Sequence, residues 1–292
     1  MEISFIGTGI MGTAMASNLL KAGFALTIWN RSKDKLGSLL EQGATEANEL
    51  HGAIKAADVI ITMLSNPEAV SAIAEGPEGI FQNAKPNTMW INTSTVNPSF
   101  VHTMAEKSHH AGVRYLDAPV SGSKLPAEKG ELVFLLGGEN KDAEEARPIL
   151  SAMGKTIHYL GKHGMGTSMK MVLNLLLGQA MLSFAEGINL GLACGLSKEV
   201  LFQTIIGGPL VAPFLQAKRT KLEQGNYEPE FPLELLHKDL HLALQTAYEQ
   251  ELALPLTAAA KEIFGMAKSK EFGRLDVSSI FDYVQQNNKR DA

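Results

Sequence analysis

A glycine-rich turn separates the first apolar run of the chain from its first amphipathic segment. The run ISFIG (3–7) has the composition of a strand, and residues 11–22 have helical apolar spacing. Between them, Gly7, Gly9 and Gly12 give the pattern G-x-G-x-x-G. In a strand–turn–helix unit these glycines make the tight turn, let the backbone approach a pyrophosphate, and let the helix pack closely on the strand. The pattern predicts a dinucleotide-binding unit, and the alternative is a glycine-rich turn in an α/β domain that binds no nucleotide.

Short apolar runs alternate with amphipathic segments up to about residue 160. The runs are rich in Ile, Val, Thr and aromatic residues, and Gly, Pro, Asn and Asp bound them. The predicted strands are 3–7, 26–30, 58–64, 88–94 and 113–120, with two more at one edge of the sheet, 131–138 and 156–161. The segments between them, such as 11–22 and 98–111, read as helices. This alternation predicts an α/β fold with a doubly wound, Rossmann-type parallel sheet covered on both faces.

The strand pattern ends near Gly166, and the rest of the chain has helical spacing interrupted by glycine and proline. We predict a Rossmann-type domain over 1–163 and an all-helical domain over 164–292, with ligands bound in a cleft between them. The most apolar stretch, 171–196, contains Asn174, Gln179, Glu186 and Asn189. We therefore expect a buried helix there, not a membrane span.

Composition excludes several classes of function. With 26 Lys and Arg against 31 Asp and Glu, the net charge is −5, and no basic run offers a face for nucleic acid. Cys194 is the only cysteine, so no intrachain disulfide can form and a reducing, cytoplasmic location is expected. The first residues lack the cationic region of a signal peptide. The eight histidines show no metal-ligand spacing, so no metal is expected.

The second predicted strand ends without the acidic residue that usually holds the ribose of NAD about twenty residues after the glycines. The chain has Asn30, Arg31 and Ser32 at this place. Asn30 can hydrogen-bond a ribose without adding negative charge, and Arg31 offers a planar fork matched to a phosphate. The site is therefore predicted to bind NADP(H), because a 2′-phosphate is attracted by Arg and repelled by Asp or Glu. The alternative is that Arg31 is a solvated arginine stacking on the adenine.

Four segments have characteristic sequences, and the second of them continues into a fifth. They are GTGIMGTAMASNL (7–19), DAPVSGS (117–123), GMGTSMKMVLN (164–174) and KDL (238–240), with GSKLPAEKG (122–130) as the continuation. Over essentially its whole length the chain resembles the β-hydroxyacid dehydrogenase family. GSKLPAEKG resembles the branch of glyoxylate/succinic semialdehyde reductases, whereas other branches tend to carry a further glycine where Ser123 stands. The resemblance implies NADPH-dependent reduction of small aldehyde acids.

Lys170 is the predicted proton donor. It lies four residues before Asn174, so both share one helix face. Carbonyl reduction needs a hydride on the carbon and a proton at the oxygen, and no histidine occupies an obvious motif position. An ammonium group can donate to the carbonyl oxygen and stabilise the developing alkoxide. The alternative is a lysine that snorkels from an apolar helix.

The remaining assignments are more open. Ser121 and the amide of Gly122 can hold a substrate carboxylate, with Ser123 in the same loop, or they form a plain turn. Phe231 is predicted to line the substrate pocket, with a core aromatic as the equal alternative. Asp239 is predicted to orient Lys170, or it is an ordinary carboxylate on a helix face. By resemblance only, Thr95 lies at the nicotinamide and Lys238 approaches the cofactor.

The predicted cofactor site comprises Gly7, Thr8, Gly9, Ile10, Met11, Gly12, Asn30, Arg31, Ser32, Met63, Leu64, Ser65, Thr95 and Lys238. The predicted catalytic residues are Lys170, Asn174 and Asp239. The predicted reactions are glyoxylate to glycolate and succinic semialdehyde to 4-hydroxybutyrate. The alternatives are a 3-hydroxyisobutyrate or 4-hydroxybutyrate dehydrogenase working in the oxidative direction, and a non-catalytic scaffold of the same fold. A homodimer or homotetramer is expected, because the long apolar helix has more surface than a small helical domain can cover.

Overall fold

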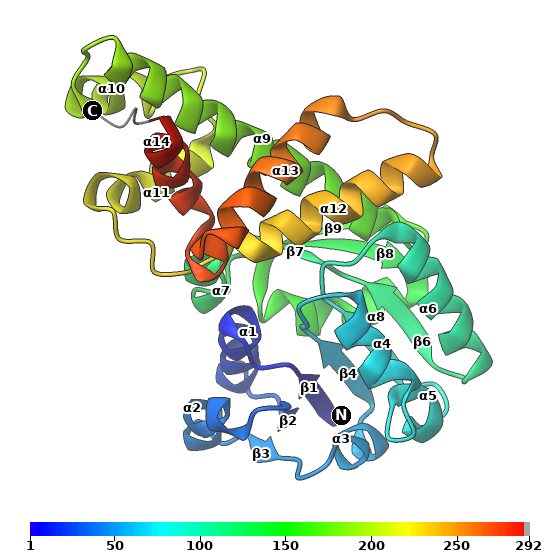
Figure 1. The fold of residues 1–292 in the computed structure, drawn as a ribbon. Helices are drawn as coiled ribbons and strands as arrows, with labels where there is room; N and C mark the ends of the chain where they lie inside the picture. Colours follow the sequence, from blue (N-terminus) through cyan, green and yellow to red (C-terminus); the bar gives the residue numbers. More distant parts are fainter. Residues whose placement is uncertain (289–292) are drawn as a thin grey trace. The chain divides into compact units, whose positions relative to one another are not determined.

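The computed structural model describes residues 1–288, and the chain packs as two compact units. The first unit covers Met1–Met171 and the second begins at Val172. The division falls inside one long helix, α9 (Met165–Ala193), which is labelled in Figure 1.

The first unit is built on a nine-stranded sheet. The strands are β1 (Ile3–Ile6), β2 (Leu26–Trp29), β3 (Thr45–Glu46), β4 (Val59–Thr62), β5 (Met89–Asn92), β6 (Arg114–Asp117), β7 (Val120–Ser121), β8 (Leu132–Gly138) and β9 (Gly154–Gly161). Their order is β3-β2-β1-β4-β5-β6-β8-β7, with β9 paired to β8. Neighbours from β3 to β6 are parallel, β8 is antiparallel to both β6 and β7, and β9 is parallel to β8. This is the predicted doubly wound sheet.

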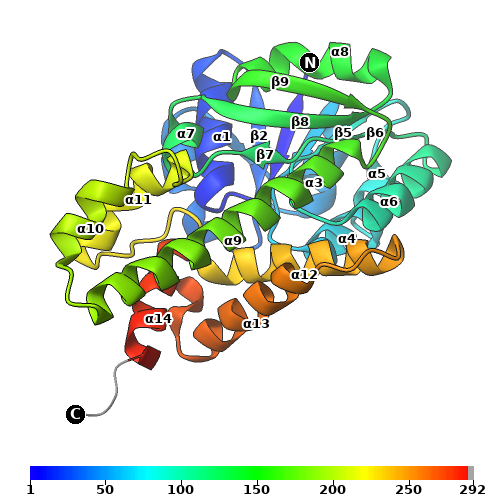
Figure 2. The same ribbon diagram turned by 90° about the horizontal axis from the view of Figure 1, so that it is seen from above.

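Helices cover both faces of this sheet because successive strand residues point to opposite sides. Ile61 and Ile91 join one buried cluster, whereas their neighbours Ile60 and Trp90 join another. The helices are α1 (Ile10–Lys21), α2 (Gly37–Glu41), α3 (Leu50–Ala56), α4 (Pro67–Glu75), α5 (Ile80–Asn83), α6 (Pro98–His110), α7 (Lys124–Glu128) and α8 (Asn140–Ser151), with a 3₁₀ turn at Lys33–Lys35. Figure 2 shows β8 and β9 side by side, with α8 along β9. Both faces are therefore buried, as a parallel sheet requires.

The strand predictions hold with two differences. The expected strand over 113–120 is broken after Asp117, and Val120–Ser121 forms the separate strand β7 against β8. Pro119 lies in the break, where it has no N–H to give to a ladder. The two-residue strand β3 was not predicted, because Thr45–Glu46 is too short to show any alternation.

The second unit is helical. Apart from α9 it contains α10 (Lys198–Ile205), α11 (Pro213–Gln224), α12 (Leu233–Glu249), α13 (Pro255–Ser269) and α14 (Ile280–Asn288), with 3₁₀ turns at Phe272–Arg274 and Val277–Ser279. Phe184, Phe202 and Phe281 contact one another at its centre, and Leu236 and Phe264 join the same core. The prediction of an all-helical C-terminal part is confirmed.

The helix α9 was predicted as a buried helix. By length and composition it could cross a membrane, and 44% of its most apolar stretch is buried in the protein. Its buried residues, such as Met181 and Ala185, belong to the core of the second unit. Val172, Leu176 and Leu190 are exposed. The helix is therefore partly a core element and partly an apolar surface.

The predicted domain boundary at 163/164 lies just before α9, whereas the compact units divide at 171/172. The difference has a packing cause. A Cβ on Gly166 would lie 2.1 Å from the carbonyl oxygen of Leu135 in β8. The first turn of α9 thus packs directly against β8 and belongs with the first unit.

Candidate cofactor and catalytic site

The glycine-rich turn has the geometry that dinucleotide binding requires. Gly7 has φ +99°, a conformation that side-chain-bearing residues rarely adopt. A Cβ on Gly12 would lie 1.9 Å from the carbonyl oxygen of Gly7, so α1 can pack against the turn only with glycine there. A Cβ on Gly9 would meet no heavy atom of the described chain within 4 Å, its chain neighbours aside. Gly7 therefore makes the tight turn, Gly12 serves packing, and Gly9 leaves one side of the turn open to a ligand.

The first turn of α1 is uncapped by its own sequence. Gly9 is the N-cap and has no side chain to bond the following amides. Ile10 is exposed and Met11 half-buried at this end of the helix. Thr8 is buried, and among residues 1–288 its hydroxyl has no hydrogen-bond partner. These groups fit a bound pyrophosphate, which would accept from helix N-terminal amides and from a hydroxyl.

Asn30 connects the turn to the end of β2. Its Oδ1 accepts from the backbone N–H of Thr8 at 3.1 Å, and its Nδ2 donates to the carbonyl oxygen of Ser32 at 2.8 Å. Asn30 thus holds two loops together, which its sequence position did not indicate. Contact with a ribose stays a prediction, for which the second Nδ2 hydrogen remains. Arg31 and Ser32 are exposed beside it.

The ends of β1, β4 and β5 bring the other predicted cofactor residues to the same edge of the sheet. Ile6 pairs with Thr62, and Thr62 with Asn92, so the residues that follow each strand lie next to one another. These residues are Met63 and Leu64, both half-buried, the exposed Ser65, and the half-buried Thr95. The amide of Leu64 donates to Oγ of Ser94 at 2.9 Å. Ligands of open α/β sheets bind at this carboxyl edge.

The predicted substrate loop begins inside a strand. Ser121 pairs with Val133 of β8, and Gly122 and Ser123 follow before α7 begins at Lys124. Gly122 has φ +127° and is exposed, so a side chain would strain the loop. The short strand and α7 fix both ends of this loop.

Asp117 ends β6 and is fully buried. Its two carboxylate oxygens accept from the amides of Gly164 and Thr167, each at 2.9 Å. Burial raises the pKa of Asp117 from 3.8 to about 6, although these two amides and nearby His163 act in the opposite direction. We did not predict a role for Asp117, and its place in the segment DAPVSGS was the only signal.

Lys170 and Asn174 lie on α9 as predicted, one turn apart, with Lys170 half-buried and Asn174 buried. In the second unit, Nδ2 of Asn174 donates to Oδ2 of Asp239 at 2.6 Å. The other oxygen of Asp239 lies 2.8 Å from Nζ of Lys238. Asp239 thus links α12 to α9 through its hydrogen bond with Asn174, and it forms an ion pair with the ammonium group of Lys238. Its predicted contact with Lys170 stays a prediction.

A buried ion pair includes a carboxylate that also accepts a hydrogen bond from the backbone of Phe231. Nζ of Lys218 lies 2.9 Å from both Asp276 and Glu230, and Oδ2 of Asp276 also accepts from the amides of Glu230 and Phe231. Burial alone would raise the pKa of Asp276, but Lys218 and the hydrogen bonds of Ser278 outweigh it and lower that pKa. Phe231 is partly buried against the core of the second unit. Its predicted place in the substrate pocket stays a prediction.

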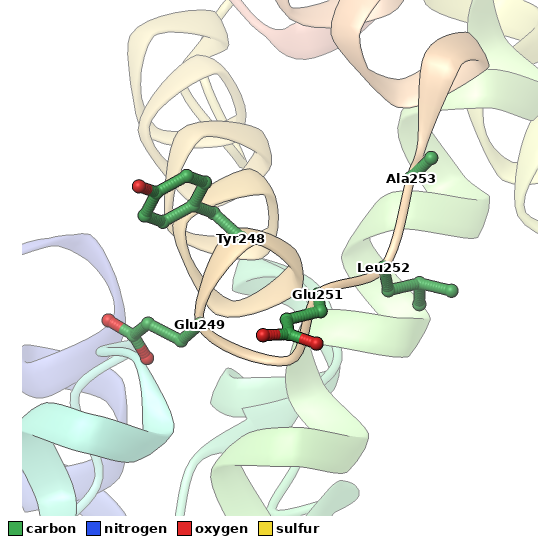
Figure 3. Close-up of a pocket in the computed structure, with 5 residues that line it drawn as sticks. All are labelled: Tyr248, Glu249, Glu251, Leu252 and Ala253. Atoms are coloured by element: carbon green, nitrogen blue, oxygen red, sulfur yellow. The ribbon is translucent and has the colours of Figure 1, made fainter.

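An open hollow lies at the turn from α12 to α13 (Figure 3). It measures about 580 Å³, and its lining residues are Tyr248, Glu249, Glu251, Leu252 and Ala253. None of these is a predicted site residue. Within the part of the chain that the structure describes, no three His, Cys, Asp or Glu residues gather as a metal site.

Two family models match the chain. The NAD-binding domain of 6-phosphogluconate dehydrogenase matches residues 2–161. The NAD-binding domain of NADP-dependent 3-hydroxyisobutyrate dehydrogenase matches residues 164–284. The two matches together span both the glycine-rich turn and the helix that carries Lys170.

Among curated proteins, the chain is 36% identical to glyoxylate/succinic semialdehyde reductase 1 of Arabidopsis thaliana, covering 98% of this chain and 99% of that protein. It is also 36% identical to 2-(hydroxymethyl)glutarate dehydrogenase of Eubacterium barkeri, covering 98% and 95%. Among solved structures, 3-hydroxyisobutyrate dehydrogenase of Mycobacterium tuberculosis with L-serine aligns at a TM-score of 0.87. Its identity is 27%, with 97% of this chain and 99% of that chain covered.

Proposed function

The chain belongs to the β-hydroxyacid dehydrogenase family of NAD(P)-dependent oxidoreductases, and on this premise we propose that it reduces small aldehyde acids with NADPH. The proposed substrates are glyoxylate and succinic semialdehyde. The observation that supports this most is that one compact unit contains three parts: the glycine-rich turn, the loop at Ser121 and the turn of α9 with Lys170.

When bound, a reduced nicotinamide cofactor would supply a hydride to the aldehyde carbon and become oxidised. The ammonium of Lys170 donates a proton to the carbonyl oxygen, so that the products are the alcohol and the neutral amine. Lys170 then regains its proton from solvent. Reduction needs the protonated form of Lys170 as an acid, whereas oxidation would need its neutral amine as a base. Ser121 and the amide of Gly122 hold the substrate carboxylate.

The proposed preference for NADPH rests on Arg31. Its guanidinium is exposed in the loop that follows β2, beside the amide of Asn30. The loop presents Asn, Arg and Ser and no carboxylate, so a 2′-phosphate there meets a cation and hydroxyl and amide donors.

Two other functions compete with this one. Oxidation of 3-hydroxyisobutyrate or 4-hydroxybutyrate would use the same residues with a base in place of the acid. A scaffold without activity would keep the fold only. Loss of NADPH absorbance with glyoxylate excludes the scaffold, which gives no loss. Comparing this rate with the rate for NADP⁺ and the hydroxy acid tests the direction, because an oxidative enzyme works faster with the second pair.

Aldehydes without a carboxylate are expected to be poor substrates. A site built for an acid leaves its donors unpaired when the acid is missing, which costs about 1–3 kcal/mol per group. With NADPH, kcat/KM for butanal is therefore expected to lie at least about tenfold below that for succinic semialdehyde, which has the same carbon number. Butanal turnover equal to that of the two acids would remove the carboxylate site from the proposal.

The proposal includes self-association through the exposed face of α9. Val172, Leu176 and Leu190 lie within about 40° of one another around this helix and are 51%, 55% and 68% exposed. Such a stripe on a monomer is typical of an interface. Leu176→Asp with Leu190→Asp is expected to convert a dimer or tetramer into a 31.5 kDa monomer, because an unpaired charge is costly to bury.

Sedimentation analysis of mass tests this expectation. Leu210→Asp is the matched control, because Leu210 is 97% exposed and lies outside α9. A wild-type protein that sediments as a monomer overturns the association. A double variant that keeps the wild-type mass places the interface elsewhere.

The location proposed for the protein is the cytoplasm. Cys194 is a free and exposed thiol, which suits a reducing compartment. Redox labelling of this thiol in intact cells tests the proposal, since an oxidised Cys194 at steady state contradicts it.

A further inference from the structure

Asp117 accepts hydrogen bonds from two backbone amides at the start of α9, although it is far from that helix in the sequence. Gly164 is the residue before the helix, and its carbonyl oxygen accepts the first helical bond, from Ser168 at 2.8 Å. Gly164 has no side chain with which to cap the free amides of the first turn. Asp117 does so in its place, since Oδ1 accepts from Gly164 and Oδ2 from Thr167, both at 2.9 Å. The carboxylate thus performs from β6 what an N-cap residue normally performs locally.

Glycines on two other elements make room for this contact. A Cβ on Gly137 in β8 would lie 2.5 Å from Oδ1 of Asp117 and 2.9 Å from Oδ2. Gly166 lets the helix approach the backbone of Leu135, and Gly164 has φ +87°. The carboxylate therefore fits against β8 only because Gly137 has no side chain. Asp117 is 1% exposed with both oxygens bonded, so it cannot touch a substrate itself.

The contact joins two segments of the proposed site. Asp117 lies four residues before Ser121, at the end of the strand from which the substrate loop departs. Thr167 lies three residues before Lys170, one turn earlier on the same helix. We propose that Asp117 is a positioning residue that fixes the first turn of α9, and with it Lys170, relative to the Ser121–Ser123 loop. This inference rests on the proposed function for the roles of Lys170 and the loop.

The test compares Asp117→Asn with Asp142→Asn in the full chain. An asparagine keeps the shape but offers one acceptor oxygen and turns an NH₂ group toward the second backbone amide. Asp142 is a matched control: it is also buried, and it accepts from Arg114, at the opposite end of β6, at 3.0 Å. A loss that comes only from general destabilisation would appear in both variants.

Three measurements distinguish positioning from stability. Hydrogen exchange of the peptide covering 163–171 is expected to rise about tenfold or more in Asp117→Asn, because a lost charge-assisted bond opens the first turn. The kcat for aldehyde acids is expected to fall about 10- to 100-fold, as for a misplaced catalytic group, with the Kd for NADPH within about twofold of wild type. The isotope effect on kcat with NADPH deuterated at the transferred position is expected to rise, because chemistry becomes slower than product release.

Asp142→Asn is expected to lower the melting temperature while leaving the isotope effect and the exchange at 163–171 unchanged. Faster exchange in Asp117→Asn with wild-type kcat and isotope effect would overturn the positioning role. Unchanged exchange would overturn the contact itself. If Asp117→Asn does not fold, Gly137→Ala disturbs the same carboxylate, because its Cβ would lie 2.5 Å from Oδ1 of Asp117, and the same outcomes apply. If the wild type reduces no aldehyde acid, the proposed function fails, while the exchange measurement still decides whether Asp117 fixes the helix.

Discussion

Replacing Lys170 with alanine is expected to lower kcat by about 10²–10⁴-fold, the range that general acid catalysis contributes, or more where alkoxide stabilisation is also lost. The Kd for NADPH is expected to stay close to wild type, because the cofactor residues of the first unit are untouched. Lys170→Arg should not restore turnover, since a guanidinium is wider and a much weaker acid. Steady-state kinetics with glyoxylate and fluorescence titration of NADPH measure the two quantities.

Lys162→Ala is the control for this prediction, because Lys162 is an exposed lysine in the turn just before α9. Its activity is expected to match wild type. Near-normal turnover in Lys170→Ala would remove this residue from the mechanism. An equal loss in both variants would point to the helix start as a whole, not to one ammonium group.

Replacing Arg31 with aspartate is expected to weaken NADPH binding about 10- to 100-fold relative to NADH, because a charge-assisted hydrogen bond to the phosphate contributes about 1.5–3 kcal/mol. The loss for NADH is expected to be small, since that cofactor has no 2′-phosphate. Titration of both cofactors against wild type and variant measures the change in preference.

Lys35→Asp is the control for charge alone, because Lys35 is exposed in the 3₁₀ turn four residues further on and undergoes the same charge change. It is expected to leave the NADPH/NADH ratio unchanged. Equal losses for the two cofactors in Arg31→Asp would mean that Arg31 does not read the phosphate. If the two substitutions change the NADPH/NADH ratio equally, the preference arises from the net charge of the loop and not from one contact of Arg31.

Much of the fold could be predicted from local patterns. A strand buried on both faces is a continuous apolar run, as in the wholly buried Val59–Thr62, and such runs are visible without partners. The parallel arrangement of these strands follows from their alternation with helices, whereas their order in the sheet is seen only in the structure. What could not be predicted depends on partners far away in the sequence. The strand β3 exists only because Thr45 and Glu46 pair with Thr27 and Ile28.

The candidate site shows the same limit. The glycine spacing predicted the turn because the turn is made within a few residues. The structure gives Gly7 the positive φ of the tight turn and Gly12 the expected close packing against it. The bond between Asn30 and Thr8 spans 22 residues, and the bond between Asp239 and Asn174 spans 65. Neither has a local signature. The assignments of individual residues to cofactor and substrate therefore remain predictions, which the experiments above address.

The sharing of α9 between the two units limits how this chain can be recombined with its relatives. The two units divide within a continuous helix. Each residue inserted or deleted between Lys170 and Asn174 would therefore rotate the side chains that follow by about 100° around the helix axis. The two residues are now about 40° apart around the helix, and one insertion would separate them by about 140°. Chimaeras of this family are therefore best joined before Gly164, where the chain is not yet helical. A join inside α9 would have to leave the number of residues between Lys170 and Asn174 unchanged, so that the helical phase is preserved.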